Sequence, residues 1–210
     1  MKKLILAAAI TTCAMSVLAQ GTINFTTRTS SGSAFVYVGG TAQLQGTNID
    51  YVALGYHLIG ASGNTAEASK YMAQLIGAPG SGTAESSLLP STSPPTTFRT
   101  GTAAGNVFPT TATFNNIPLD AATGTFEMVV WDNSSGLYPT WAQASAVAGL
   151  SIYGGRSAPF TLSQIGGTVN TPPVPFPGLQ NFNVFLVPEP ATVSLAGLGA
   201  AALLIFRRRK

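Results

Sequence analysis

The sequence of 210 residues contains a single cysteine, Cys13, which lies in an apolar stretch near the N-terminus. One cysteine cannot form an intrachain disulfide, and a thiolate metal site requires further ligands of the same kind or histidines. Residues 10–12 (Ile-Thr-Thr) precede Cys13 and do not provide the small side chains of a lipobox. The sequence therefore excludes a disulfide-stabilised fold and a thiolate metal centre, and it does not favour lipid attachment at Cys13.

Charged residues are also scarce, at 8% of the chain, and the formal net charge of +3 comes from the two ends. Between residues 4 and 188 the charges are four basic residues, which are Arg28, Lys70, Arg99 and Arg156, and six acidic residues, which are Asp50, Glu67, Glu85, Asp120, Glu127 and Asp132. This region therefore carries a net charge of −2. Because the positive charge is confined to the termini, the basic composition does not indicate nucleic-acid binding.

The chain has one histidine, His57, so a histidine-based catalytic triad would have to use it. His57 lies in an alternating segment, where a hydrogen-bonded sheet residue is the more common role. The carboxylates are dispersed and no motif pairs two of them, as a glycosidase would need. Residues 132–136 (DNSSG) are typical of a turn and need no calcium ion to explain them. The sequence predicts no catalytic site, metal site or cofactor.

The first nineteen residues have the three parts of a secretory signal peptide. Lys2 and Lys3 form the basic n-region, residues 4–18 are mainly apolar, and short side chains occupy positions −3 and −1 before Gln20. We therefore predict export through the inner membrane, with signal peptidase cutting between Ala19 and Gln20.

A second apolar segment, residues 191–206 (ATVSLAGLGAAALLIF), ends directly at Arg207, Arg208, Arg209 and Lys210. As a helix it would be about 24 Å long, somewhat short of the roughly 30 Å of a bilayer core, and a snorkelling arginine covers part of the difference. The four terminal cations act as a stop-transfer signal and would stay cytoplasmic by the positive-inside rule. This segment predicts a membrane anchor with the preceding region outside.

Val187, Pro188, Glu189 and Pro190 stand immediately before this span. The order of this motif, the apolar span and the terminal arginine cluster resembles the PEP-CTERM sorting signal of Gram-negative bacteria. The resemblance implies that an exosortase, a membrane-embedded cysteine transpeptidase, recognises the tail and cuts near the motif. It also implies an association with exopolysaccharide or biofilm. Residues 188–210 would then be a temporary anchor, and the mature protein would reach the cell surface or the extracellular space.

Residues 20–187 are predicted to form one exported all-β domain. Short alternating segments bounded by turn residues recur without a sustained helical period, which favours an antiparallel β-sandwich of Ig/fibronectin-like or jelly-roll-like type. The predicted strands are residues 22–26, 33–38, 51–59, 71–76, 96–100, 110–117, 125–132, 160–162 and 181–187. In 125–132, Phe126, Met128 and Val130 share one face, and Glu127, Val129 and Trp131 share the other.

A helix and two Pro-rich segments are predicted between these strands. Residues 138–150 are the one predicted helix, starting at Pro139 or Thr140, with an irregular connection as the alternative. The Pro-rich segment 89–95 is predicted to be a surface loop between the front and back strands, and the segment 171–177 is predicted to lie outside the sheet. Residues 98–101 (FRTG) and 155–157 (GRS) resemble PEP-CTERM proteins of Verrucomicrobia-type bacteria, a resemblance that implies no activity.

Four aromatic residues, Trp131, Tyr138, Trp141 and Tyr153, lie close together in the sequence. Exposed aromatic rings can stack on sugars, so these four are candidate glycan contacts, although packing within the fold is the favoured interpretation. Three functions follow. The first is a non-enzymatic surface or matrix protein, the second is a carbohydrate-binding module acting on exopolysaccharide, and the third, least favoured, is a secreted hydrolase.

Overall fold

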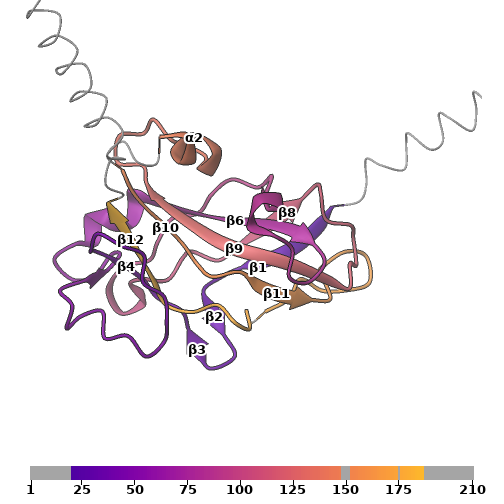
Figure 1. Ribbon diagram of the computed structural model, residues 1–210, viewed down its shortest axis with the longest axis horizontal. Helices are drawn as coiled ribbons and strands as arrows, with labels where there is room; N and C mark the ends of the chain where they lie inside the picture. The colour runs from indigo at the N-terminus through magenta and orange to yellow at the C-terminus, as the bar shows by residue number, and fades with distance from the viewer. Residues whose placement is uncertain (1–19, 148–151, 175, 187–210) are drawn as a thin grey trace, which may run out of the picture.

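The computed structural model describes residues 20–147, 152–174 and 176–186, and within these ranges it is mostly β with one short α-helix (Figure 1). Gln20 is exposed at the start of the described region. The predicted signal peptide, residues 1–19, the sorting motif with its span and basic tail, residues 187–210, and the last part of the predicted helix lie outside the described residues. Among the residues that are described, no helix has the length and apolar character needed to span a bilayer.

Eight strands of the described region form one mixed sheet in the order β5-β4-β12-β10-β9-β6-β7, with β11 also paired to β9. The long strands β6 and β9 run side by side through its centre (Figure 1). The bounds are β4 (Val36–Val38), β5 (His57–Leu58), β6 (Tyr71–Pro79), β7 (Leu89–Pro90), β9 (Thr123–Asp132), β10 (Tyr153–Arg156), β11 (Phe160–Ser163) and β12 (Phe182–Leu186).

Strand β12 lies between β4 and β10, antiparallel to β10 and parallel to β4. The prediction of a wholly antiparallel sheet is therefore wrong at the β12–β4 pair. A parallel pair needs a long connection, here from Val38 to Phe182, and no local sequence pattern reports such a distant partner. The sandwich type stays a prediction.

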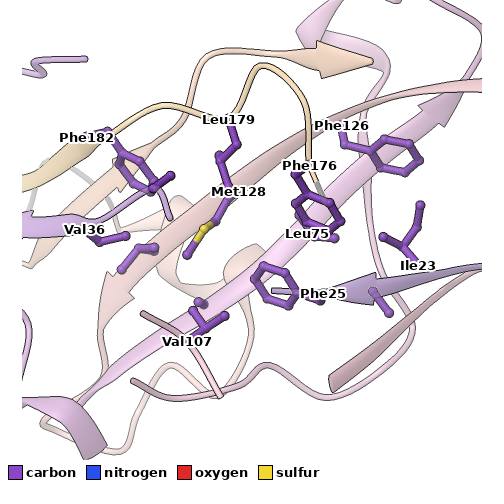
Figure 2. Packing of buried hydrophobic residues seen from close by; sticks show 14 of the residues in the cluster. Ile23, Phe25, Val36, Leu75, Val107, Phe126, Met128, Phe176, Leu179 and Phe182 are labelled. Atoms are coloured by element: carbon purple, nitrogen blue, oxygen red, sulfur yellow. The ribbon is translucent and has the colours of Figure 1, made fainter. Parts of the chain in front are cut away.

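Two further antiparallel pairs lie outside the large sheet: β1 (Gly21–Phe25) with β8 (Thr110–Phe114), and β2 (Arg28–Thr29) with β3 (Gly32–Ser33). Alternate residues of β1 and β8 are buried in the main core, and the ring of Phe114 meets the ring of Phe126 edge-on at 5.4 Å. Figure 2 shows this core, with Ile23 and Phe25 close to Leu75 and Phe126. The β1–β8 pair thus covers one face of the β6–β9 sheet.

Strand β9 is buried on both faces, as its alternation predicts. Phe126, Met128 and Val130 belong to the main core, while Val129 and Trp131 belong to a smaller cluster on the opposite face. That second cluster is covered by Leu88, which follows the 3-10 helix η2 (Glu85–Ser87), and by Ala144 of α2 (Trp141–Ala146). Figure 1 shows α2 and the β2–β3 hairpin on opposite sides of the long strands.

Helix α2 begins where the sequence predicts. Thr140 is its N-cap and forms a capping box with Gln143: the Gln143 backbone N–H donates to the Thr140 hydroxyl, and the Thr140 backbone N–H donates to the Gln143 side chain. Each interaction satisfies a backbone donor that the helix cannot pair itself. The predicted helix 138–150 is therefore confirmed from 141 to 146, and residues 148–151 lie outside the described part.

Most predicted strands are confirmed in their central residues, namely 22–26, 71–76, 110–117, 125–132, 160–162 and 181–187. The predicted strand 33–38 is divided between β3 and β4, and 96–100 is reduced to the isolated bridges Thr96–Ala73 and Phe98–Val107. Strands β2 and β10 and the 3-10 helices η1 (Thr65–Ser69), η2 and η3 (Gly101–Ala103) were not predicted. The prediction of a loop over 89–95 is wrong at Leu89–Pro90, which form β7 at the edge of the large sheet because only an edge position leaves the proline without a ladder partner on its other side.

The prediction of a strand over 51–59 is wrong for residues 51–56, of which residues 51–55 form turns. The Asp50 side chain accepts a hydrogen bond from the Ala53 backbone N–H, and the Leu54 N–H donates to the Asp50 carbonyl. Gly55 then adopts a φ of 83°, a conformation that favours glycine. Local hydrogen bonds from an aspartate override the alternation here, and only His57–Leu58 pair as a strand.

Candidate functional site

The sequence singled out four aromatic residues, and the structure separates them. Trp131 has no exposed surface, and its indole Nε1–H donates to the Tyr138 carbonyl at 2.7 Å. Trp131 packs against Trp141, with ring centroids 5.9 Å apart. A glycan contact at Trp131 is therefore not available in this fold, since neither face of its ring is open. Its role is to pack beneath α2.

Trp141 and Tyr138 are half-buried and pack on the same cluster as Trp131, whereas Tyr153 packs on the main core at the opposite face of the sheet. The separation follows from the strand geometry, because Tyr153 and Arg156 are an odd number of residues apart in β10 and point to opposite faces. The four aromatic residues do not form one platform. Trp141 is the member that borders an open hollow.

Trp141 is held by the strand beneath it. Its backbone N–H donates to Oε1 of Gln74 at 3.4 Å, and the Gln74 amide Nε2 donates to the Ser91 carbonyl at 2.9 Å. Gln74 is buried, so its amide bonds fix the first turn of α2 over β6. The position of the Trp141 ring thus follows from a polar residue inside the sheet as well as from apolar packing.

A hollow of about 270 Å³ lies beside this ring, between α2 and the strands β10 and β12. Gly154 and Gly155 line it, and Arg156 and Ser145 supply polar groups. An added Cβ at Gly154 would find no atom closer than 3.8 Å, so the absence of a side chain there leaves the hollow open. The Arg156 guanidinium carbon lies 5.9 Å from the Trp141 ring centroid, within cation–π range.

Arg156 also contacts two carboxylates that lie far apart in the sequence. Its Nη1 lies 3.4 Å from Oε2 of Glu127 in β9 and 3.3 Å from Oε2 of Glu85 in η2. Glu127 has no exposed surface, while the Glu85 side chain is 56% exposed. The arginine therefore connects the inside of the sheet with the segment that covers it.

Glu127 has a buried oxygen atom that lacks a hydrogen bond. Its Oε1 atom is buried and has no hydrogen-bond partner among them. Burial raises the pKa of Glu127 to about 7, Arg156 acts in the opposite direction, and Glu85 adds to the increase. The protonation state of this carboxyl group therefore changes near neutral pH.

The backbone of Arg156 is fixed by the side chain of Gln43. The Gln43 Nε2 donates to the Arg156 carbonyl at 2.9 Å and to the Asn183 carbonyl at 3.2 Å, and its Oε1 accepts from the Arg156 N–H at 3.2 Å. A side-chain amide thus takes the place of a strand partner at the end of β10. It holds the Arg156 backbone in place beside Trp141 and above Glu127.

The groups around this hollow are of the kind that contact ligands. A ring face, a guanidinium and a hydroxyl surround a shallow hollow, and these groups can stack on a ligand ring and bond to its polar substituents. A glycosidase needs two carboxyl groups that flank the substrate, but Glu127 has no exposed surface from which to reach one. Within the described ranges, no group of three or more His, Cys, Asp or Glu residues is arranged to hold a metal ion.

His57, the one histidine of the sequence, lies away from this hollow. His57 Nε2 is 2.9 Å from Oε2 of Glu67, and both side chains are partly exposed. The pair joins β5 to η1, which is a structural connection of the kind expected for a strand histidine. Sequence reasoning missed Arg156 and Glu127 as partners, although the isolated charge of Glu127 within an apolar strand was a signal that it needs a buried counter-ion.

Comparison with known proteins identifies one region. Residues 186–210 match the PEP-CTERM protein-sorting motif, which includes Val187 to Pro190 and Arg207 to Lys210. Comparisons with curated proteins and with solved structures gave no match. The chain therefore carries a PEP-CTERM protein-sorting motif at its C-terminus, and this motif implies an exported protein that an exosortase processes and sorts to the cell surface.

Proposed function

We propose that the protein is a non-enzymatic component of the cell surface or extracellular matrix, associated with exopolysaccharide and anchored in the membrane only until an exosortase acts on residues 187–190. The observation that carries the proposal is the sorting motif at 186–210, which directly follows the last described strand, β12. The signal peptide predicted at residues 1–19, with cleavage before Gln20, supplies the export step. The described region is compatible with this proposal, since Glu127 has no exposed surface from which to reach a substrate.

The test is the C-terminus of the mature protein, determined by mass spectrometry in cells with and without the host's exosortase. We expect a C-terminus near Pro188–Pro190 when the enzyme is present and an intact tail ending at Lys210 when it is absent. Changing Pro188, Glu189 and Pro190 together to alanine should reproduce the intact tail, whereas Pro172→Ala in the Pro-rich loop should not. An intact tail in both strains would overturn the proposal and leave a permanent membrane anchor.

A second candidate is a carbohydrate-binding module, favoured by the hollow at Trp141. A half-buried indole beside a guanidinium and a bare glycine floor is suited to a sugar ring. The mature protein recovered from producing cells should then bind glycans on an array, with the signal lost in Trp141→Ala. Phe108→Ala is the control, because Phe108 is an exposed aromatic residue that does not line this hollow. Equal binding by both variants would exclude the Trp141 hollow as the site.

A further inference from the structure

Two of the few basic residues, Arg28 and Arg99, lie together on a second surface of the molecule. A hollow of about 420 Å³ lies beside the β2–β3 hairpin, and Arg28 and Arg99 both line it. Neither arginine forms an ion pair with the described residues. Within the described part of the chain, the basic partners of the salt bridges are His57 and Arg156. Asp and Glu are absent from the described lining of this hollow, although acidic residues outnumber basic ones between the two terminal segments.

A neighbouring hollow of about 350 Å³ shares part of this lining. Thr26, Arg28 and Pro109 line both hollows, and the two together are called the Arg28–Arg99 groove below. The described lining of the second hollow also contains no acidic residue. Arg28 thus borders both hollows, and Arg99 borders the first.

The rest of the lining mixes hydroxyl and amide groups with apolar side chains such as Phe35, Val107 and Pro109. Thr102 and Thr111 are exposed along the groove, and Asn106 lies partly buried where its Oδ1 accepts from the Thr27 hydroxyl at 2.7 Å. Hydroxyls and amides hydrogen-bond the hydroxyl groups of a polymer in both directions, since they donate and accept. Guanidinium groups pair with carboxylates in a bidentate manner.

We propose that the Arg28–Arg99 groove binds an extended acidic polysaccharide, with the two guanidinium groups paired to carboxylates of its uronic acid residues and the exposed threonine hydroxyls bonded to ring hydroxyls. The site is separate from the Trp141 hollow, which lies between α2, β10 and β12. It does not depend on exosortase processing, so either idea can fail without the other.

The probe is an oligogalacturonate, measured by calorimetry with the full-length chain in detergent. Its fully methyl-esterified form keeps the ring hydroxyls and removes the charge. We expect the acid form to bind at least about tenfold more tightly than the ester, and its affinity to fall with added salt because exposed charges are screened. Undetectable binding of the acid form, or equal binding of the ester, would overturn the proposal.

Variants locate the site. Arg28→Gln and Arg99→Gln should each weaken oligogalacturonate binding about tenfold, and Arg99→Lys should restore part of the affinity, since it returns the charge without the bidentate geometry. Lys70→Gln is the matched control, because it removes one exposed positive charge that does not line the groove and should leave binding unchanged. Unchanged Tm values would show that the arginine variants remain folded. Equal loss in all three glutamine variants would contradict the proposed site, and equally tight binding of a poly-glutamate peptide of matched charge would contradict the proposed ligand class.

Discussion

The guanidinium of Arg156 lies above the carboxylate of Glu127, with 3.4 Å between Nη1 and Oε2. The carboxylate has no exposed surface, while the arginine side chain is 39% exposed. A buried charge that loses its partner is strongly destabilising, because water cannot replace the missing counter-ion. The stability of this sheet should therefore depend on the pair, and on pH.

We expect Arg156→Ala to destabilise the protein by up to about 3–5 kcal/mol at pH 8, where Glu127 loses its counter-ion. The loss should be smaller at pH 5, because Glu127 is then protonated. Urea unfolding at the two pH values measures both. Glu85→Gln is the control: Glu85 is an exposed partner of the same arginine, so its loss should cost less than about 1 kcal/mol. An Arg156→Ala effect that does not change with pH would rule out this explanation.

Glu127 should also make the unfolding free energy fall as the pH rises. Its pKa is about 7 in the folded state, against the ordinary value of 4.5 for a glutamate, so the folded state retains a proton between these values that the unfolded state has lost. Stability should therefore decrease from about pH 4.5 to about pH 7, by an amount of order 1–3 kcal/mol. In Glu127→Gln this part of the pH dependence should disappear. Urea midpoints measured from pH 4 to 8 test it, and an unchanged slope in the variant would refute the assignment.

Asp120 should contribute in the opposite direction. Its carboxylate accepts hydrogen bonds from the backbone N–H groups of residues 168–170 and from the Thr168 hydroxyl. These bonds, led by the one from Asn170, lower the pKa of Asp120 to about 2. The stabilisation is complete above the ordinary aspartate pKa of 3.8 and is lost as the pH falls through about 2. Asp120→Asn should lower the Tm at pH 7, and this difference should shrink toward pH 2.

Gly167→Ala provides the comparison for Asp120, because an added Cβ would lie 2.6 Å from the Asp120 backbone nitrogen. That clash is steric, so the drop in Tm should persist at every pH. If the deficit of Asp120→Asn at pH 7 remained undiminished near pH 2, the hydrogen-bonded carboxylate would not be its source.

Two strand glycines should respond differently to the same substitution. A Cβ at Gly77 would lie 2.4 Å from the Phe126 ring in the main core, whereas a Cβ at Gly154 would meet no atom within 3.8 Å. Gly77→Ala should destabilise the protein by about 1–3 kcal/mol through overpacking. Gly154→Ala should be close to neutral, because alanine also lowers the entropy of the unfolded chain. Guanidinium unfolding of both variants measures the difference, and equal losses would contradict the steric explanation.

Alternation was a reliable guide where a strand has two distinct neighbours to pack against. Residues 125–132 were predicted with the correct faces because apolar side chains occupy both sides of β9. The pattern failed at 51–56, where Val52 and Leu54 alternate with other residues yet remain exposed on a turn that Asp50 stabilises. A pattern of residue types records which side chains are apolar, but it does not record which backbone groups a nearby aspartate will bind.

The candidate sites depended on contacts between distant segments, which the sequence does not reveal. Glu127, Glu85 and Arg156 lie 29 or more positions apart in each pair that touches, and they meet because β9, η2 and β10 converge. The same holds for Arg28 and Arg99 in the groove. By contrast, the sorting motif is contiguous, so its order of parts was sufficient to predict it, and residues 186–210 confirm it.

The position of β12 in the sheet has a consequence for the order of events during export. The strand ends at Leu186, where the sorting motif begins, and it lies between β4 and β10 rather than at an edge. Until it has crossed the membrane, β4 and β5 have no strand connecting them to β10, β9 and β6. A chain that emerges from its N-terminus would therefore complete its sheet only when the sorting segment reaches the bilayer. Closure of the sheet and presentation of the processing site would then coincide, and an exosortase would meet a chain whose folding is just finishing.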